Sequence, residues 1–321
     1  MPTKFFHPRY WLVWLGLGLL WLITRLPWSW QMGIGSVIGK LLFHALPSRR
    51  KVSCINLKIA FPELDSQALI ELNKKHYISL AQGLLDAAQS WWGNTKRLEK
   101  LTHIEGIEHI KAAKAAGENV LLVGAHFTSL EVGGRIIAAH TPVDAVYRPH
   151  HNDLLEFLVA KERNKHFRKT ISKRNIRQMI KSLKEGHVSW YATDQNYRLK
   201  GSILIPFFGV DAPTNPSTAR IAKMTKATVI PIFTLRLLGD KNDKRKGYLL
   251  RILPPLKDFP SGDDYQDIVR LNQIIEEQIK EFPEQYLWSH ERYKHYRNEN
   301  RDKNKNFYKD YLREHPEVNC Q

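Results

Sequence analysis

The chain has 321 residues, 43% of them hydrophobic, so it can bury one large core, which excludes an intrinsically disordered protein. Its 49 Lys and Arg residues outweigh 32 Asp and Glu residues, and the formal net charge is +17 at pH 7. This charge indicates an anionic partner: nucleic acid, phospholipid headgroups, or an acidic protein with a phosphorylated substrate. The two cysteines, Cys54 and Cys320, have no metal or redox spacing, and we expect free thiols in a reducing compartment.

The first predicted element is an apolar helix near the N-terminus. Tyr10–Thr24 contains no charged residue and is rich in Trp and Leu. Its 15 residues would form a helix about 22 Å long, whereas the hydrocarbon core of a bilayer is about 30 Å thick. A short span in which Arg25 snorkels and a helix that lies in the membrane interface therefore both remain open. In either case we predict a membrane anchor over residues 1–32 and one domain over residues 33–321.

Basic residues on either side of this helix predict its orientation if it spans the membrane. Lys4 and Arg9 precede it, and a larger group follows: Lys40, Arg49, Arg50, Lys51 and Lys58. The positive-inside rule then places the domain in the cytoplasm. The glycines of Met32–Lys40 miss the spacing of a dinucleotide-binding loop. We interpret them as the small-residue face of a helix over Ser36–Leu46, packed on the anchor or on the bilayer.

The remainder of the chain predicts an α/β fold with a mainly parallel sheet flanked by helices. A long helix is expected over Ser66–Trp91 and another over Gly106–Ala116, after which strands and helices alternate. Strands are expected near Val120–Val123, Pro142–Tyr147, His187–Ala192, Thr228–Leu235 and Tyr248–Leu253, and helices near Asp153–Asn164, Asn175–Glu185, Ser217–Lys226 and Asp263–Phe282. Active sites of open α/β folds lie at the carboxyl ends of strands, so residues that follow these strands are the candidates.

Residues 118–135, ENVLLVGAHFTSLEVGGR, have the pattern of a buried strand, a short turn and a helix. Thr128 or Ser129 is expected to cap the helix, and Glu131 falls in its first turn. Across such a turn the Glu131 carboxylate can hydrogen-bond one imidazole nitrogen of His126, which leaves the other nitrogen free to take a proton. The alternative is a structural histidine beside an unrelated surface glutamate. The pair predicts a general base that acts on a hydroxyl, and no G-x-S-x-G elbow provides a covalent nucleophile.

Five segments of the chain resemble one known family. They are HPRYWLVWLGLGLLWL near the N-terminus, GAHFTSLEVGGR around His126, YRPHHN from Tyr147, TDQN from Thr193 and PEQYLWSHERYK from Pro283. The family is that of the late (secondary) acyltransferases of lipid A biosynthesis, of the Kdo2-lipid IVA lauroyltransferase type. The resemblance implies a glycerolipid-acyltransferase-like fold with His126 and Glu131 as the catalytic pair. It also implies that Arg163 and Asp194 are needed for activity, although position alone leaves Asp194 open as a turn or cap carboxylate.

The resemblance also implies the reaction, the partners and the location. An acyl chain would move from acyl carrier protein, the thioester co-substrate, to a 3-hydroxyacyl hydroxyl of Kdo2-lipid IVA in lipopolysaccharide biosynthesis. No other cofactor, no metal and no nucleic acid is expected. The enzyme would lie at the bacterial inner membrane, with its catalytic domain on the cytoplasmic face. The alternatives are an acyltransferase for a glycerophospholipid or another glycolipid and, from a different class, a membrane-tethered nucleic-acid-binding protein.

Basic residues form two further groups. One could bind glycolipid phosphates or the acidic side chains of a carrier protein, with Arg148 and Arg174 as candidate contacts, and a solvated helix face is the alternative. Its members are Arg148, Arg163, Lys165, Arg168, Lys169, Lys173, Arg174 and Arg177. The second group is the basic and aromatic tail Arg292–Arg313, which we expect to lie on the domain or on the anionic membrane. His290 and Arg292 are further candidates for the lining of the pocket.

Overall fold

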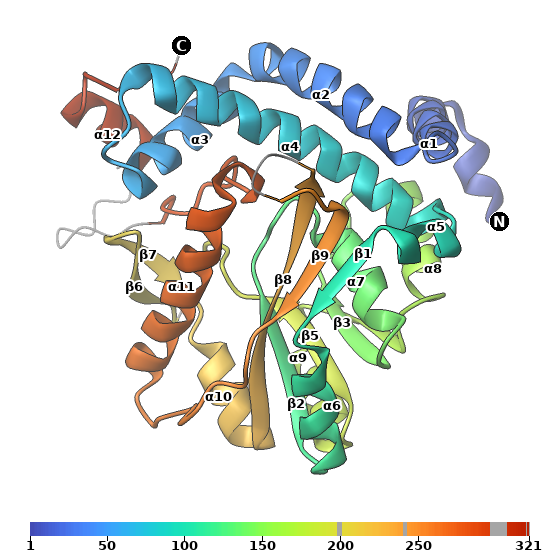
Figure 1. Ribbon diagram of the computed structural model, residues 1–321, viewed down its shortest axis with the longest axis vertical. Coiled ribbons are helices and arrows are strands. Elements are labelled where there is room, and N and C mark those ends of the chain that lie inside the picture. The colour runs from blue at the N-terminus through green and yellow to red at the C-terminus, as the bar shows by residue number, and fades with distance from the viewer. Residues whose placement is uncertain (198–200, 240–242, 296–306, 319, 321) are drawn as a thin grey trace.

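The computed structural model describes residues 1–197, 201–239, 243–295, 307–318 and 320. Within these residues seven strands form one sheet in the order β1-β9-β8-β2-β5-β3-β4, and β6 and β7 form a separate hairpin (Figure 1). The strands are β1 (Thr102–Glu105), β2 (Asn119–Gly124), β3 (Val143–Tyr147), β4 (Lys169–Ser172), β5 (Val188–Ala192), β6 (Ile203–Phe207), β7 (Val210–Thr214), β8 (Ala227–Leu238) and β9 (Lys246–Ile252). The α-helices are α1 (Trp11–Ile23), α2 (Trp28–Ala45), α3 (Pro47–Ala60), α4 (Ser66–Trp92), α5 (Thr95–Lys100), α6 (Ile107–Ala115), α7 (Leu130–Ala138), α8 (Asp153–Arg163), α9 (Ile176–Lys184), α10 (Ser217–Thr225), α11 (Asp264–Glu281) and α12 (Phe307–Glu314).

Most of the sheet is parallel, which confirms the predicted fold class. β8, β2, β5, β3 and β4 run in one direction, whereas β9 is antiparallel to β8 and β1 is parallel to β9. The strands and helices predicted from residue 66 onward are present, with ends that differ by a few residues. The sequence does not predict β1, β4 or the hairpin, because β1 and β4 are only four residues long and the hairpin strands contain Pro206 and Pro213.

The two faces of β2 are buried by different helices. Val120 and Leu122 belong to the apolar cluster that includes α6 and α7, whereas Leu121 and Val123 belong to the cluster that includes α9 and α10. Because successive side chains of a strand point to opposite faces, a strand between two helical layers is apolar at every position. The residues that follow β2 therefore start from a rigidly packed point.

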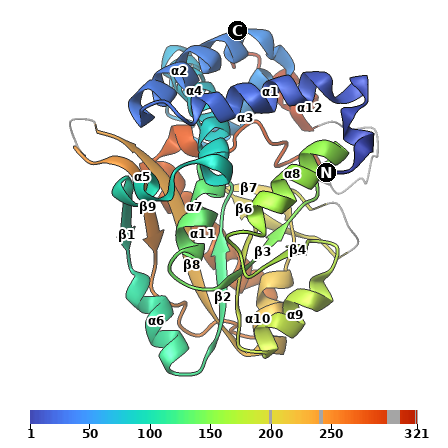
Figure 2. The ribbon, with the colours of Figure 1, turned by 90° about the vertical axis from the view of Figure 1, so that its right-hand side faces the viewer.

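Helices α2, α3 and α4 form a layer across the carboxyl edge of the parallel strands (Figure 1), as the rotated view also shows (Figure 2). The Asp65 carboxylate caps α4 by accepting a hydrogen bond from the Ala68 N–H at 2.8 Å. Gly39 of α2 lies so close to the Ile78 backbone of α4 that no side chain would fit between the two helices. The predicted small-residue face thus packs on α4, rather than on the anchor or the bilayer, and its helix begins at Trp28.

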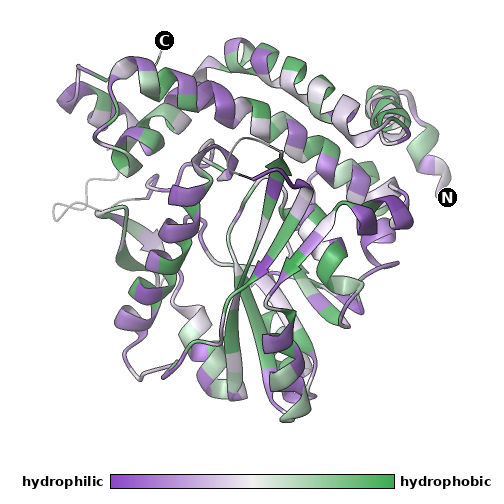
Figure 3. Cartoon of the chain, in the orientation of Figure 1, coloured by the Kyte–Doolittle hydropathy of each residue, from purple (hydrophilic) through white to green (hydrophobic). Residues whose placement is uncertain are grey.

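Helix α1 presents apolar side chains on the outside of the molecule. It is 13 residues long, and hydrophobic residues predominate along it (Figure 3). Leu12 is 83% exposed and Leu15 is 62% exposed. In the part of the chain that the structure describes, no helix combines the length and the apolar character needed to cross a bilayer. The anchor over residues 1–32 remains a prediction.

The expectation that Cys54 and Cys320 are free thiols is wrong, because the two form a disulfide in the structure. The bond joins cysteines that are 266 positions apart in the sequence, and local residue spacing does not predict such a pairing. Helix α12 packs on α3 nearby, where the Tyr308 hydroxyl donates a 3.0 Å hydrogen bond to the Asn56 side-chain oxygen. The described part of the basic tail therefore lies on the domain. Residues 296–306 of that tail lie outside the described residues.

Candidate active site

Two loops at the carboxyl edge of the sheet bring His126 and Asp194 together. His126 follows β2 and Asp194 follows β5, and these strands are parallel neighbours in which Gly124 pairs with Ala192. The backbone N–H of His126 donates a 3.0 Å hydrogen bond to Asp194 Oδ2, and His126 Nδ1 lies 2.6 Å from Asp194 Oδ1. Asp194 thus reaches His126 at the edge of the sheet, as its place after a strand end predicts.

Asp194 determines which nitrogen of His126 carries the proton. Burial alone would raise the pKa of this carboxyl, which is 2% exposed, but the charge and hydrogen bonds of His126 and a hydrogen bond from Tyr286 hold the pKa of Asp194 well below its usual value. An ionised carboxylate only accepts hydrogen bonds, so Nδ1 of His126 is the protonated donor. In the neutral form of the ring Nε2 then carries the lone pair, on a side chain that is 26% exposed.

The predicted hydrogen bond between Glu131 and His126 is wrong. Glu131 does lie in the first turn of α7, but its carboxylate binds Arg163 of α8. Arg163 Nε donates to Oε1 at 2.8 Å and Nη2 donates to Oε2 at 2.7 Å, while Trp91 Nε1 donates to Oε1 at 2.9 Å. The planar arginine fork matches both carboxylate oxygens, and Asp194 already occupies the imidazole nitrogen that faces the protein. The carboxylate that binds His126 is therefore that of Asp194, which follows the neighbouring strand β5, and not that of Glu131.

Arg163 and Glu131 form a tight pair that leaves one arginine donor unused. Although burial alone would raise it, the hydrogen bonds and charge of Arg163 keep the pKa of Glu131 below its usual value. The guanidinium carbon of Arg163 lies 5.2 Å from the centre of the Tyr147 ring. Arg163 Nη1 is buried and has no hydrogen-bond partner among the described residues. Because unpaired buried donors are costly, this nitrogen is suited to an oxygen atom of a bound substrate.

The turn that carries His126 is held by partners that the sequence does not predict. The predicted side-chain cap of α7 is absent from the described residues, since the Ser129 hydroxyl donates instead to the Thr234 carbonyl oxygen at 2.7 Å. The Thr128 hydroxyl is hydrogen-bonded to the Ser79 hydroxyl of α4 at 2.8 Å. A Cβ atom at Gly83 of α4 would overlap the Thr128 carbonyl oxygen. Helix α4 therefore fixes one side of this turn by direct backbone contact.

Gly83→Ala is expected to lower kcat, because the added methyl group must displace either α4 or the turn that carries His126. The atom in its way is backbone, and overpacking of this kind costs about 1–3 kcal/mol. Gly33→Ala is the matched control, since it is also a helical glycine and an added Cβ meets no atom within 4 Å. Measurements of kcat and Tm on both purified variants check this expectation. An unchanged kcat for Gly83→Ala would show that α4 does not position the turn.

The opposite side of the turn pairs with the C-terminal segment around Tyr286. The Leu287 N–H donates a 3.0 Å hydrogen bond to the His126 carbonyl oxygen, and Tyr286 forms an antiparallel bridge with Phe127. The Tyr286 hydroxyl also hydrogen-bonds the carboxylate of Asp194. Sequence reasoning missed Tyr286, although it lies in the matched segment PEQYLWSHERYK, which was the available signal.

Two more side chains of the site were not singled out from the sequence. Trp91, at the end of α4, donates to Glu131, and no spacing rule connects residues 40 positions apart. His150 has its Nε2 buried without a partner among the described residues. Burial and the charge of Arg163 lower the pKa of His150, which favours the neutral form of this imidazole. The signal in the sequence was the segment YRPHHN, which begins at the last residue of β3.

The structure divides the basic group that surrounds α8 and α9. Arg168 is bound to the buried Asp144, to which its Nε donates at 2.8 Å, and Arg163 is held in the site. The charges of these two cations are therefore already paired with carboxylates of the domain. Arg148 and Arg174 remain exposed, and among the described residues no hydrogen bond or ion pair links either to the histidine of the site. Their proposed contacts with a substrate or carrier thus concern the surface, not the reacting atoms.

Comparison with known proteins gives these residues a family context. The family model described as bacterial lipid A biosynthesis acyltransferase matches residues 1–295. The lipid A biosynthesis lauroyltransferase of Escherichia coli (strain K12) is 36% identical over 293 residues, which cover 91% of this chain and 94% of that protein. The palmitoleoyltransferase of the same organism is 35% identical over 292 residues, with the same coverage. The lipid A biosynthesis myristoyltransferase of Escherichia coli (strain K12) is 24% identical over 288 residues, which cover 89% of this chain and 87% of that protein.

Proposed function

We propose that this chain, which belongs to the bacterial lipid A biosynthesis acyltransferases, moves a fatty acyl chain from acyl carrier protein to a 3-hydroxyacyl hydroxyl of Kdo2-lipid IVA. The observation that carries the proposal is the contact of 2.6 Å between His126 and Asp194, which leaves the second imidazole nitrogen as a general base. A base at the carboxyl edge of the sheet, without a serine or cysteine nucleophile elbow, favours direct transfer between donor and acceptor.

In the proposed reaction His126 Nε2 takes the proton of the acceptor hydroxyl while that oxygen attacks the carbonyl carbon of the thioester. The carbonyl oxygen becomes an oxyanion, and the tetrahedral intermediate then breaks its carbon–sulfur bond. The thiolate leaves and receives the proton from the His126 imidazolium, so that an ester and the free thiol of the carrier are the products. Asp194 stabilises the imidazolium and keeps the ring oriented.

Arg163 is the proposed donor to the oxyanion. Its Nη1 is buried and unpaired among the described residues, while Nε and Nη2 are held by Glu131. A donor that is oriented before the reaction stabilises developing charge without reorganisation. In this proposal Glu131 acts through Arg163 as a positioning residue, and the catalytic base is the His126–Asp194 pair.

The proposed acceptor is a lipid, and the outer helices provide a surface suited to a membrane. The exposed apolar residues of α1 and α2 are Trp11, Leu12, Leu15, Leu19, Trp21, Leu22, Trp30, Val37 and Leu41. Arg25 and Lys40 are exposed among them. Apolar and tryptophan side chains flanked by cations are typical of helices that lie in the interface of an anionic membrane. We infer that the enzyme lies on the cytoplasmic face of the inner membrane through this surface.

The double variant Leu15→Asp, Leu19→Asp is expected to bind anionic phospholipid vesicles at least about tenfold more weakly than the unchanged protein. Each buried leucine side chain contributes about 1.5–3 kcal/mol, and a carboxylate is repelled by the anionic surface. Met224→Asp is the control, because Met224 lies on α10 at the opposite end of the molecule and has the same 52% exposure as Leu19 (Figure 1). Cosedimentation with vesicles measures the binding. Equal binding of the double variant and the control would contradict the membrane surface.

A purified-enzyme assay tests the donor and the acceptor of the proposed reaction. Labelled acyl carrier protein and acyl-coenzyme A are offered as donors, and Kdo2-lipid IVA and a lysophospholipid as acceptors. We expect transfer from acyl carrier protein to Kdo2-lipid IVA, with a donor KM that rises with salt because an acidic carrier meets exposed cations such as Arg148 and Arg174. Equal use of both donors without salt dependence would remove the carrier from the proposal, and preference for the lysophospholipid would remove the acceptor.

A further inference from the structure

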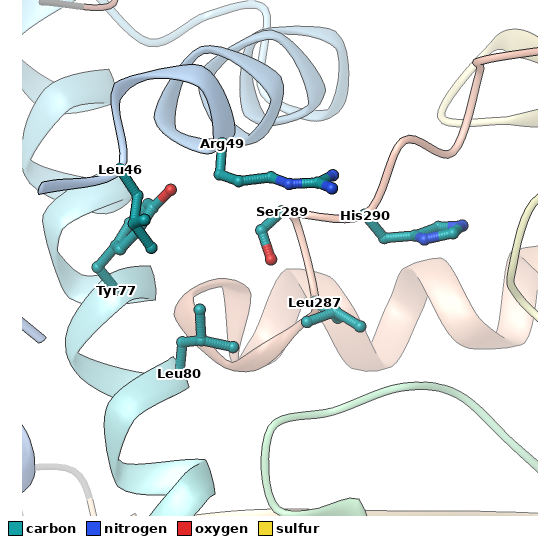
Figure 4. Close-up of a pocket in the computed structure, with 7 residues that line it drawn as sticks. All are labelled: Leu46, Arg49, Tyr77, Leu80, Leu287, Ser289 and His290. Atoms are coloured by element: carbon teal, nitrogen blue, oxygen red, sulfur yellow. The ribbon is translucent and has the colours of Figure 1, made fainter. Parts of the chain in front are cut away.

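A surface cavity of about 280 Å³ lies between the outer helices and the C-terminal segment (Figure 4). It is formed where α2 ends and α3 begins, by one face of α4, and by the residues that follow Tyr286. Its lining residues are Leu46, Arg49, Tyr77, Leu80, Leu287, Ser289 and His290. In Figure 4 the Arg49 side chain extends above Ser289, while Leu80 and Leu287 lie below it. The cavity therefore combines an apolar floor with one cation.

The cavity adjoins the candidate active site through two of its lining residues. The Leu287 N–H donates to the His126 carbonyl oxygen at 3.0 Å, so the cavity floor is one hydrogen bond from the turn that carries the base. His290 Nε2 accepts a 3.1 Å hydrogen bond from the backbone N–H of Asn196, on the loop that also carries Asp194. Burial lowers the pKa of His290 to about 4, so this side chain is neutral and adds no charge to the cavity.

Arg49 is the charged residue of the cavity, and its present partner is weak. Its guanidinium lies 4.0 Å from the Glu291 carboxylate, and its side chain is 57% exposed. Glu291 has a closer cation in Lys294, at 2.7 Å. The adjacent Arg50 differs, because its guanidinium lies over the Phe43 ring and donates to the Phe43 carbonyl oxygen at 3.3 Å. Arg49 can therefore turn toward a ligand at little cost.

We propose that this cavity is a subsite for the acceptor glycolipid, in which Arg49 binds a phosphate group and the three leucines contact part of an acyl chain. This assignment rests on the proposed function and adds the location of the acceptor. An arginine fork binds phosphate with two hydrogen bonds, and an apolar floor beside it matches a ligand that is anionic at one end and aliphatic at the other. An acidic carrier protein would be bound by several cations, whereas Arg49 is the one arginine or lysine among the residues that line this cavity.

The position of the cavity supports this occupant. Leu46 and Arg49 belong to the α2–α3 junction, and the same layer presents the apolar surface proposed to contact the membrane. A lipid held there stays at the membrane while its reactive hydroxyl extends toward His126. The exposed cations Arg148 and Arg174, on the segments around α8 and α9, remain for the carrier. The two substrates would thus approach the base from different parts of the surface.

The test compares Arg49→Ala and Arg49→Glu with Lys51→Glu, an exposed cation of the same helix that does not line the cavity. The probe is the phosphorylated lipid A precursor, alongside the same glycolipid after phosphatase treatment. We expect Arg49→Ala to raise the acceptor KM about tenfold or more, Arg49→Glu to raise it further, and the donor KM and kcat to change little. Phosphatase treatment should weaken binding to the unchanged protein and have no further effect on Arg49→Ala.

Direct binding of both glycolipids in detergent, measured on the His126→Ala background, separates this subsite from the reaction itself. Phosphate-dependent binding that needs Arg49 and not Lys51 supports the subsite even if no acyl transfer is detected, in which case the proposed function alone fails. Equal binding of the two glycolipids to the protein with Arg49 intact would overturn the subsite. A rise in the donor KM in place of the acceptor KM would also overturn it, because Arg49 would then serve the carrier.

Discussion

His126→Ala and Asp194→Asn are each expected to lower kcat by about 10²- to 10⁴-fold without unfolding the protein. The first removes the base, and general-base catalysis is typically worth that factor. The second replaces an acceptor with a group that also donates, so the imidazole loses its tautomer and the stabilisation of its cation. Measurement of kcat at saturating concentrations of both substrates, with Tm recorded for each variant, tests this expectation.

The double variant His126→Ala, Asp194→Ala shows whether these two residues act as a unit. Its kcat should be little lower than that of His126→Ala alone, because Asp194 acts only through the ring that has been removed. Losses that multiply would show independent roles. If instead Asp194→Asn cost less than about tenfold, while Glu131→Gln abolished turnover and gave no further loss on His126→Ala, the pair predicted from sequence spacing would be correct and the pair in the structure would not be the catalytic one.

Arg163→Ala is expected to lower kcat by about 10²- to 10³-fold, with a smaller effect on the KM of either substrate. Loss of one oxyanion donor has an effect of this size, and here it also leaves Glu131 partly buried without its cation. Arg163→Lys should recover little activity, because an ammonium group cannot hold both oxygens of Glu131 and still present a third, fixed donor. Steady-state kinetics with each substrate varied separate the effect on kcat from the effects on KM.

Arg168→Ala is the control for this prediction. Arg168 also binds a carboxylate through Nε and Nη2, in this case that of the buried Asp144. Among the described residues no hydrogen bond or ion pair links Arg168 or Asp144 to His126. Its loss should reduce the free energy of unfolding and leave the kcat of the folded protein near normal. If Arg163→Ala reduced only the stability in the same way, Arg163 would be a structural residue and the oxyanion would need another donor.

The sequence by itself determined most of the longer elements of the fold and the strand end at which the candidate site lies. The continuous apolar run of β2, the alternation of strands with helices, and the histidine two residues after a strand are local features. Local features are set by backbone propensity and by which faces of an element are buried, and both can be interpreted from neighbouring residues. Short or proline-containing strands such as β4 and β6 escaped prediction because their pairing comes from contacts with distant strands.

The tertiary structure alone decided which carboxylate serves His126. Glu131 is five positions away along the chain, yet Asp194, 68 positions away, holds the imidazole because β5 is the neighbour of β2 in the sheet. Arg163 of α8 binds the Glu131 carboxylate, which therefore does not bind the imidazole of His126. Strand order, the Cys54–Cys320 disulfide and the pairing of charges on the surface all depend on how distant segments are brought together. Residue spacing contains no such information, since the free energy of each contact depends on the partner that the fold provides.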